Sequence, residues 1–185
     1  MITHKYGVEY PITFRKVSIE DSEILKDFDC GNPSINDFIQ RKCLNEKGKV
    51  TYIFLDTENN QVICFCSICC TGISINAMYG SRRCTTSIPS IEIDFFAVDE
   101  RYRSIPFDEE SNRYETLSNT LFSFIIEKIE EIAEEHVGAT RICLYSVPQA
   151  VSFYKRSGFK DFEEYMNADD KPYIDGCIPL FLTIA

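Results

Sequence analysis

The segment with the clearest capacity for chemistry is residues 150–159, which read Ala-Val-Ser-Phe-Tyr-Lys-Arg-Ser-Gly-Phe and follow a predicted strand at 141–145. Tyr154 lies in its middle. A tyrosine hydroxyl has an ordinary pKa near ~10, so it is protonated at neutral pH and can give a proton to a leaving group. The alternative is that Phe153 and Tyr154 only pack a short helix, which Gly158 ends.

Two carboxylates are candidates for the opposite proton transfer. Glu92 and Asp94 alternate along a predicted strand at 90–98, so their side chains point to the same face of a sheet. A carboxylate can accept a proton from a reacting group, directly or through water. The alternative is that both side chains face solvent or pair with Arg82 or Arg83.

The nine cysteines raise the question of a metal site. Cys66 and Cys69 have the spacing of a zinc-ligand pair, but they lie inside an apolar run, and the sequence has no second Cys-x-x-Cys or His-x-x-x-His pair. We therefore predict buried, reduced cysteines, no metal, and a cytoplasmic location. The two histidines, His4 and His136, do not look catalytic.

The composition is that of a globular chain with an acidic surface. The 185 residues are 44% hydrophobic and 26% charged, and the net charge is −10, which predicts a single domain spanning residues 1–185. No run approaches the ~20 apolar residues that a membrane span needs, so we expect no membrane partner. The acidity disfavours general binding to phosphate backbones and is more compatible with an amine-bearing substrate, although it also serves solubility.

Hydrophobic periodicity predicts the elements that must position these residues. Strands are expected at 12–17, 51–55, 61–75, 90–98, 141–145, 159–162 and 178–182. Helices are expected at 18–25, 34–45, 117–136 and 149–157, with residues 76–89 as a mixed loop and 99–116 as an acidic loop. This order predicts an α/β fold, with a mixed, mostly antiparallel central sheet flanked by helices on both faces.

Residues 150–159 resemble the late helix and turn of the GNAT family of acetyl-CoA-dependent N-acetyltransferases, whose pattern is Ala-x-x-Phe-Tyr-x-x-x-Gly-Phe. The resemblance implies the GNAT acyltransferase fold and acetyl-CoA as cosubstrate. It also implies that Tyr154 lies near the sulfur of acetyl-CoA and protonates the thiolate that leaves. The implied reaction is direct attack of an amine on the thioester in a ternary complex.

Residues 93–99 look like the central strand of that family, whose backbone binds the pantetheine arm by strand-like hydrogen bonds; this implies a role for Phe96, Ala97 and Val98. The glycine-rich pyrophosphate loop of the family is missing. In its place we align the segment Arg113–Ser118, in which Arg113, Thr116, Leu117 and Ser118 are the implied cofactor-binding residues, and we expect an acidic insertion at about 101–112. Its carboxylates would oppose a diphosphate, so a non-catalytic acyl-CoA-binding or regulatory module remains an alternative.

Residues 28–39 read Phe-Asp-Cys-Gly-Asn-Pro-Ser-Ile-Asn-Asp-Phe-Ile. They are similar to a stretch of the GNAT toxins of bacterial toxin–antitoxin pairs, which acetylate the amino acid on charged tRNA. This resemblance implies charged tRNA as an alternative acceptor, with an antitoxin as partner, and it is compatible with a homodimer. The same stretch also reads as a turn and N-cap before an amphipathic helix. Motifs of hydrolases, P-loop proteins and dinucleotide-dependent oxidoreductases are missing from the sequence.

Overall fold

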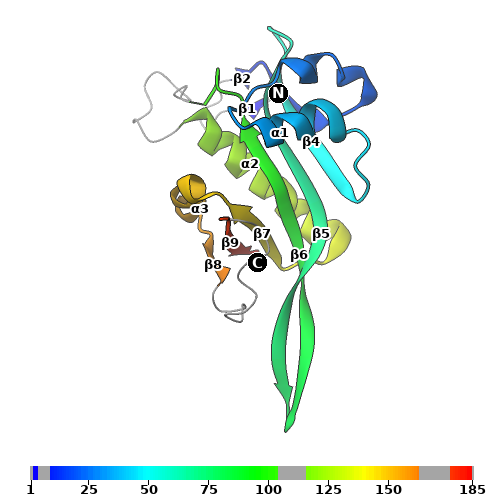
Figure 1. Ribbon diagram of the computed structural model, residues 1–185, viewed down its shortest axis with the longest axis vertical. Helices are drawn as coiled ribbons and strands as arrows, with labels where there is room; N and C mark the ends of the chain where they lie inside the picture. The colour runs from blue at the N-terminus through cyan, green and yellow to red at the C-terminus, as the bar shows by residue number, and fades with distance from the viewer. Residues whose placement is uncertain (1, 4–8, 104–115, 163–175, 185) are drawn as a thin grey trace. The chain divides into compact units, whose positions relative to one another are not determined.

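The computed structural model describes residues 2–3, 9–103, 116–162 and 176–184 (Figure 1). Its sheet has the strand order β3-β4-β5-β6-β7-β9-β8. The pair β6–β7 is parallel, whereas β3–β4, β7–β9 and β8–β9 are antiparallel. The predicted mixed, mostly antiparallel sheet with helices is therefore confirmed.

The elements follow the predicted order along the chain. The strands are β1 (Ile2–Thr3), β2 (Glu9–Tyr10), β3 (Ile12–Lys16), β4 (Lys49–Asp56), β5 (Gln61–Tyr79), β6 (Arg82–Val98), β7 (Arg141–Ser146), β8 (Lys160–Asp161) and β9 (Ile178–Thr183). The α-helices are α1 (Pro33–Asp37), α2 (Leu117–Ile132) and α3 (Val151–Arg156). Short helical turns are η1 (Ile19–Asp21), η2 (Ile24–Asp27), η3 (Phe38–Lys42), η4 (Ala133–Val137) and η5 (Pro148–Ala150).

The chain divides into two compact units. Unit 1 comprises Met1–Ile68 and Phe95–Ile125, and unit 2 comprises Cys69–Asp94 and Ile126–Ala185. The expectation of a single domain stays a prediction.

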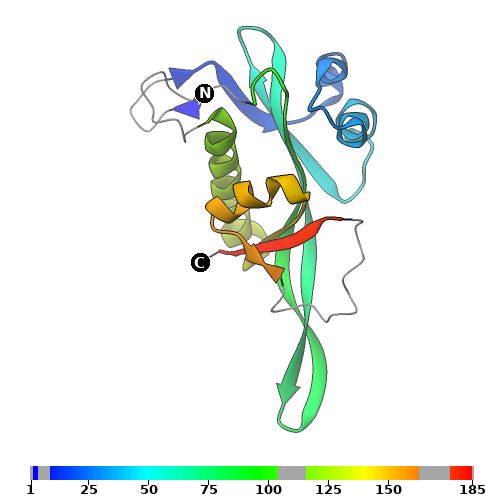
Figure 2. The same ribbon diagram turned by 60° about the vertical axis from the view of Figure 1, so that its left-hand side comes forward.

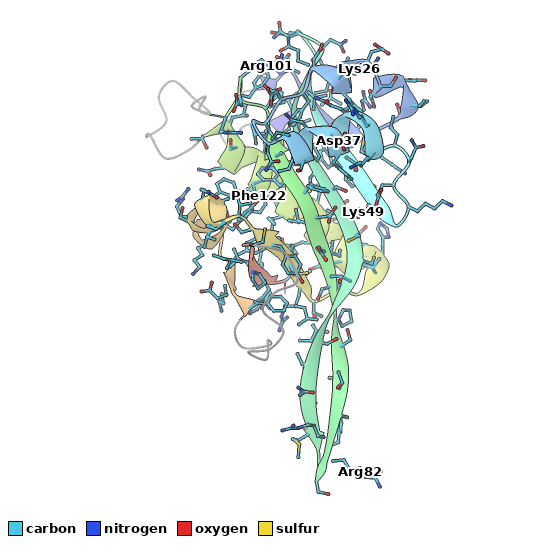
Figure 3. All side chains as sticks on the ribbon, in the orientation of Figure 1. Lys26, Asp37, Lys49, Arg82, Arg101 and Phe122 are labelled. Carbon is cyan, nitrogen blue, oxygen red and sulfur yellow. The ribbon has the colours of Figure 1, made fainter. Side chains whose placement is uncertain are left out.

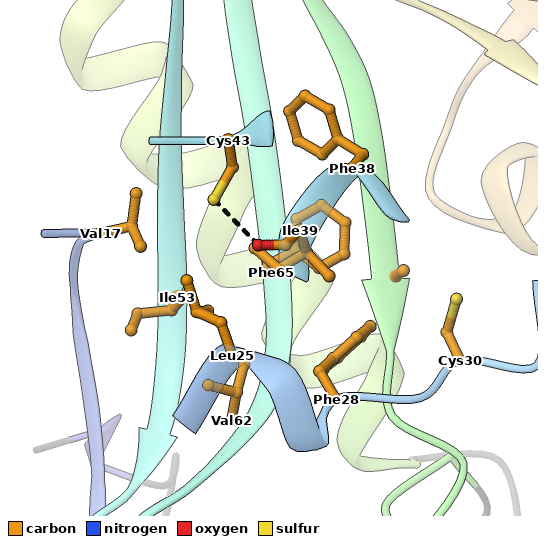
Figure 4. Close-up of a cluster of buried hydrophobic side chains, with 11 residues drawn as sticks. Val17, Leu25, Phe28, Cys30, Phe38, Ile39, Cys43, Ile53, Val62 and Phe65 are labelled. Carbon is orange, nitrogen blue, oxygen red and sulfur yellow. Dashed lines mark hydrogen bonds between the residues drawn. The ribbon is translucent and has the colours of Figure 1, made fainter. Parts of the chain in front are cut away.

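The core of unit 1 is built around aromatic rings from its strands and helices (Figure 4). Phe38 stacks on Phe95 with ring centroids 4.2 Å apart, and Phe28 meets Phe65 edge-on at 5.3 Å. The helix that carries Phe38 is started by its N-cap residue, because the side chain of Asn32 accepts hydrogen bonds from the first backbone N–H groups of α1. The stretch at 28–39 therefore has the predicted turn and cap, and it also packs into the core.

The long helix α2 is amphipathic. Leu121, Phe122, Ile125 and Ile129 are buried, at 2% exposure or less, as expected for the face of a helix that meets a core. The helix continues as the π-turn η4, and Gly138, with a φ of 65°, forms the left-handed C-cap.

Unit 2 has a small sheet with β7 at its centre. Parallel pairing joins Ser90–Ile93 of β6 to Arg141–Leu144 of β7, and antiparallel pairing joins all of β7 to β9. One face of this sheet carries a cluster of Ile73, Cys143 and Phe181, with Ile75, Ile88 and Phe162 packed against it.

The expectation of a mixed loop at residues 76–89 is wrong. β5 runs to Tyr79 and β6 starts at Arg82, so these residues form the end of a long hairpin (Figure 2). Gly80 turns the chain with a φ of 62°, a left-handed conformation that suits glycine. The segment is polar and lacks strict alternation, and it becomes strand because each half pairs with the other.

The prediction of buried cysteines is confirmed for Cys64 and Cys66 but is wrong for Cys70, which is exposed; Cys69 is half-buried. Cys64 and Cys66 are fully buried in β5, and all nine cysteines are free thiols. Burial raises the pKa of both thiols, as expected when a thiolate would lose its hydration. Among the described residues, no group of three or more His, Cys, Asp or Glu side chains could hold a metal ion.

Candidate functional site

Tyr154 lies on α3, which starts a few residues after β7. Pro148 opens the preceding turn η5, where a missing N–H costs nothing, and the chain continues directly into the helix. The carbonyl of Tyr154 accepts hydrogen bonds from the N–H groups of Ser157 and Phe159, at 3.0 and 3.2 Å. Gly158 makes this closing turn with a φ of 90°. The backbone of Tyr154 is thus fixed by the predicted helix stop.

The ring of Tyr154 is held by two aromatic neighbours. It meets Phe153 nearly at right angles with centroids 5.2 Å apart, and Phe159 at 6.0 Å. The residue is 9% exposed. A phenol held in this way presents its hydroxyl in one direction, as a group that donates a proton at a defined position must do.

Glu92 and Asp94 are half-buried residues of β6 in unit 2. Glu92 lies opposite Cys143 of β7 in the parallel register. The pKa of Cys143 is raised to about 12, first by burial and then by the negative charge of Glu92. The pKa of Tyr145 is raised for the same two reasons in the same order. The carboxylate of Glu92 therefore lies close to β7.

The alternative pairing with arginines is not what the structure shows. In the described part of the chain, no ion pair joins Arg82 or Arg83 to Glu92 or Asp94.

Strand register places Glu92 and the turn after α3 on opposite faces of the unit 2 sheet. Glu92 shares its face with its partner Cys143. The next residue along β7, Ile142, pairs with Leu182 and so points to the other face together with it. A Cβ added to Gly158 would lie 3.4 Å from the side chain of Leu182. The α3 helix stop thus packs on the face away from Glu92.

The predicted pantetheine residues form the end of β6, in unit 1. Ala97 and Val98 are buried at 7% exposure each, and the ring of Phe96 lies 4.9 Å from that of Phe122. Asp99, which follows the strand, donates its backbone N–H to the carbonyl of Ile63 at 2.9 Å. The end of this strand is therefore firmly packed.

Thr116 caps the start of α2. Its hydroxyl oxygen accepts a hydrogen bond from the N–H of Asn119 at 3.4 Å, and its carbonyl accepts from Asn119 and Thr120. Leu117 is the first residue of the helix, and the buried Ser118 donates its hydroxyl to the carbonyl of Arg103 at 3.2 Å. The hydroxyl of Ser118 is thus directed to the protein, and the backbone N–H groups of this first turn are the better anion donors.

Arg113 and residues 104–112 of the predicted insertion lie outside the described residues.

A buried cluster around Asp99 was not predicted from the sequence. The Asp99 side chain is 1% exposed. It accepts hydrogen bonds from the side chain of Arg101 at 2.7 and 2.8 Å and from the backbone N–H of Asp29 at 3.0 Å. The backbone N–H of Glu100 donates to the carbonyl of Asp29 at 2.9 Å. These bonds join the stretch at 28–31 to the end of β6. The two segments are far apart in the sequence, so no local sequence pattern could have predicted the contact.

A polar hollow of about 510 Å³ lies in the same unit, lined by Asp29, Gly31, Pro33, Asn36, Asp37, Gln40 and Arg41. Its walls are ordered by hydrogen bonds. The amide of Asn36 donates to Asp29 at 2.7 Å and accepts from the N–H of Cys30 at 3.0 Å. Gln40 donates to the carbonyl of Phe28 at 2.8 Å. Asp37, labelled in Figure 3, pairs with Lys42 at 2.6 Å.

No helix in the described part of the chain is long and apolar enough to cross a membrane.

Comparison with known proteins gives matches at the level of structure. No family model matches the sequence, and no curated protein matches it significantly. A tyrosine-to-phenylalanine variant of the AtaT toxin matches with a TM-score of 0.68 and 18% identity, covering 94% of this chain and 90% of the other. The AtaTR complex bound with acetyl-CoA matches with a TM-score of 0.63 and 18% identity, covering 94% of both chains. A tyrosine-to-phenylalanine variant of KacT matches with a TM-score of 0.67 and 12% identity, covering 94% of this chain and 95% of the other. The chain therefore has the fold of the GNAT toxins of toxin–antitoxin pairs, to which its residues 28–39 and 150–159 had pointed.

Proposed function

We propose that this protein transfers an acetyl group from acetyl-CoA to an amine by direct attack in a ternary complex. The observation that carries the proposal is the setting of Tyr154. It is a buried phenol, fixed by its own helix stop, on the helix that follows the strand that pairs in parallel with β6. This is the setting that the resemblance of residues 150–159 implied.

The amine nitrogen attacks the thioester carbonyl carbon, so a C–N bond forms and the C–S bond breaks. The sulfur leaves as a thiolate and takes the hydroxyl proton of Tyr154, which is then replaced from solvent. The proton lost by the amine passes to Glu92 or Asp94, directly or through water.

The opposite faces found in unit 2 suit a ternary complex. Glu92 lies on the face of Cys143, and the α3 turn packs on the face of Leu182. Because β6 and β7 pair only as far as Ile93 and Leu144, a base on one face and an acid on the other can act on one carbonyl carbon beyond that point, where the sheet does not separate them. We infer that the amine reaches the thioester from the Glu92 face.

We propose that the end of β6 and the start of α2 bind acetyl-CoA. Phe96, Ala97 and Val98 would supply strand-like backbone hydrogen bonds to the pantetheine arm. The backbone N–H groups of Leu117 and Ser118 would hold the diphosphate at the helix N-terminus. Thr116 would order that turn and Arg113 would add positive charge. The AtaTR complex, which has the same fold, binds acetyl-CoA, and this supports acetyl-CoA as the ligand.

The structural neighbours favour a second candidate acceptor. Neighbours that cover 94% of this chain are toxins, one of them bound to the C-terminus of its antitoxin AtaR and acetyl-CoA. The acceptor would then be the amino group of an aminoacyl-tRNA, and an antitoxin would be the partner. Growth arrest on expression, relieved by a neighbouring gene and absent in Tyr154→Phe, is the result expected of this candidate.

The test is release of free thiol from acetyl-CoA with a panel of small amines, peptides and aminoacyl-tRNA. We expect thiol release that depends on one acceptor class and falls in Tyr154→Phe. Calorimetry with acetyl-CoA separates this proposal from a non-catalytic module. Binding without release from any acceptor would point to a regulatory module, and no binding at millimolar acetyl-CoA would refute the acetyl-CoA site.

A further inference from the structure

The hairpin that the sequence did not predict is the most distinctive surface outside the proposed site. We call residues 71–89 the arm; they comprise the end of β5, a turn at Gly80 and Ser81, and the start of β6. The pairing of β6 with β7 begins only at Ser90. The arm is thus a two-stranded ribbon with Arg82 near its end, as Figure 3 shows.

The arm reverses the charge of the rest of the protein. The chain has 29 acidic residues and a net charge of −10, yet no Asp or Glu lies between Glu58 and Glu92. The charged residues of the arm are Arg82 and Arg83, and both are exposed. No ion pair in the described part of the chain includes either arginine. The end of the arm is therefore a local positive site.

Large apolar and hydrogen-bonding side chains accompany this charge. Tyr79 is 73% exposed and Met78 is 63% exposed, next to the turn. Exposed hydroxyl and amide side chains cover the rest of the ribbon, at Ser74, Asn76, Ser81, Thr85, Thr86 and Ser87. Isolated two-stranded ribbons are marginally stable in water, so a ribbon with two large exposed side chains at its end suits a partner that covers them.

We propose that the arm binds the phosphodiester backbone of a nucleic acid at a stretch of unpaired bases. The guanidinium groups of Arg82 and Arg83 would contact phosphates, and Tyr79 would stack on a base. Protein contacts to phosphates come from arginine together with Ser, Thr, Asn and Tyr side chains, which is the composition of the arm. Stacking on an aromatic side chain accepts any unpaired base.

The charge of the remaining surface limits this contact to the arm. An acidic surface repels phosphates, so the footprint is small, and the affinity depends on two arginines and one stacking ring. Composition alone argued against general nucleic-acid binding, and the folded hairpin supplies a local exception. The inference goes beyond acetyl transfer, because binding by the arm requires neither acetyl-CoA nor Tyr154.

The experiment is fluorescence anisotropy with labelled 20-nucleotide single strands of RNA and of DNA, at several salt concentrations. For two phosphate contacts to a single strand, we expect log Kd to rise with log salt with a slope of about 1.4. Arg82→Glu/Arg83→Glu should weaken binding at least about tenfold at low salt, and Tyr79→Ala about fivefold or more. The control Lys16→Glu/Lys47→Glu changes the net charge equally at exposed lysines of unit 1 and should have a much smaller effect.

Several outcomes would overturn the proposal. One is that neither the RNA nor the DNA strand binds at low salt. Another is that the lysine control loses as much affinity as the arginine variant. Competition by polyglutamate as strong as that by unlabelled RNA would instead identify an acidic polypeptide as the partner. If one of the two nucleic acids binds more tightly and the arginine variant loses this binding, the result supports binding by the arm. It also identifies RNA or DNA as the ligand. Thiol release with a small amine should stay normal in that variant, so failure of the arm and failure of the proposed enzyme are distinguishable.

Discussion

The carboxylate of Asp99 accepts a hydrogen bond from the backbone N–H of Asp29, with 3.0 Å between Asp29 N and Asp99 Oδ2. This contact ties the stretch at residues 28–31 to the end of β6. The guanidinium of Arg101 donates hydrogen bonds to both oxygens of the same carboxylate. A buried carboxylate with this many donors should stay ionised in the folded protein.

The negative charge of Asp99 should stabilise the folded protein in a pH-dependent way. Burial alone would raise the pKa of Asp99, but the hydrogen bonds from Arg101 and Asp29 outweigh it and lower the pKa. The folded pKa therefore lies below the unfolded value of about 3.9, so the charge stabilises the fold above that pH and ceases to do so as pH falls through the folded pKa. Asp99→Asn should cost about 2 kcal/mol at pH 7, measured by urea unfolding.

The difference in free energy of unfolding between the wild type and Asp99→Asn should become smaller as pH falls from 5 toward the folded pKa of Asp99. Other carboxylates titrate in the same range, so the difference between the two proteins is the quantity to compare. If the difference in free energy of unfolding were the same at all pH values, the charge of Asp99 would not be what stabilises the contact.

Tyr154→Phe tests the proposed proton donor. The substitution keeps the ring, so the contacts with Phe153 and Phe159 should persist. Acetyl transfer should slow by ~10²-fold or more, the usual effect of losing a general acid. Melting temperature and acetyl-CoA affinity, measured on the same preparation, should change little. Loss of stability with a normal rate would make Tyr154 a structural residue.

Glu92→Gln tests the proposed base. If Glu92 accepts the amine proton, its removal should lower the rate and flatten the acidic limb of the pH–rate profile. The same change removes a negative charge that helps to raise the pKa of Tyr145, so the pKa of Tyr145 should fall. Asp94→Asn is the matched control on the same face of the strand. A flattened limb in the control alone would assign the base to Asp94.

Gly31→Ala separates backbone strain from crowding. Gly31 has a φ of 76°, and an added Cβ would lie 2.3 Å from Glu100 Oε1. That oxygen is the end of a flexible side chain and can move. Gly48 has a φ of 83° with nothing within 4 Å, so Gly48→Ala carries the strain alone. Each change should cost about 1 kcal/mol, with similar melting temperatures. A much larger loss for Gly31→Ala would show that Glu100 cannot yield.

The cysteines should differ sharply in reactivity. Cys70 is exposed, whereas Cys64 and Cys66 are fully buried, and burial raises the pKa of those two thiols. Because the thiolate is the nucleophile, a thiol reagent at pH 8 should modify Cys70 quickly and leave the buried pair unmodified until the protein unfolds. Mass spectrometry of the time course checks this. Rapid labelling of Cys64 in the native protein would contradict its burial.

The sequence by itself determined the order of elements and the local devices that start and stop them. These devices act within a few residues, so they can be recognised in the sequence alone. They are the apolar periodicity of α2, the N-cap at Asn32 and the glycines that end helices at 138 and 158. The motif around Tyr154 and the stretch at 28–39 pointed to the fold for the same reason.

Only the tertiary structure decided what depends on partners distant in sequence. Residues 76–89 of the arm form strand ends and a turn because the two halves of the hairpin pair with each other, although these residues have weak strand periodicity. The contact of Asp99 with Asp29 joins residues 70 positions apart. The face that Glu92 shares with Cys143 follows from strand register, and a shift of one residue would have turned its carboxylate to the other side of the sheet.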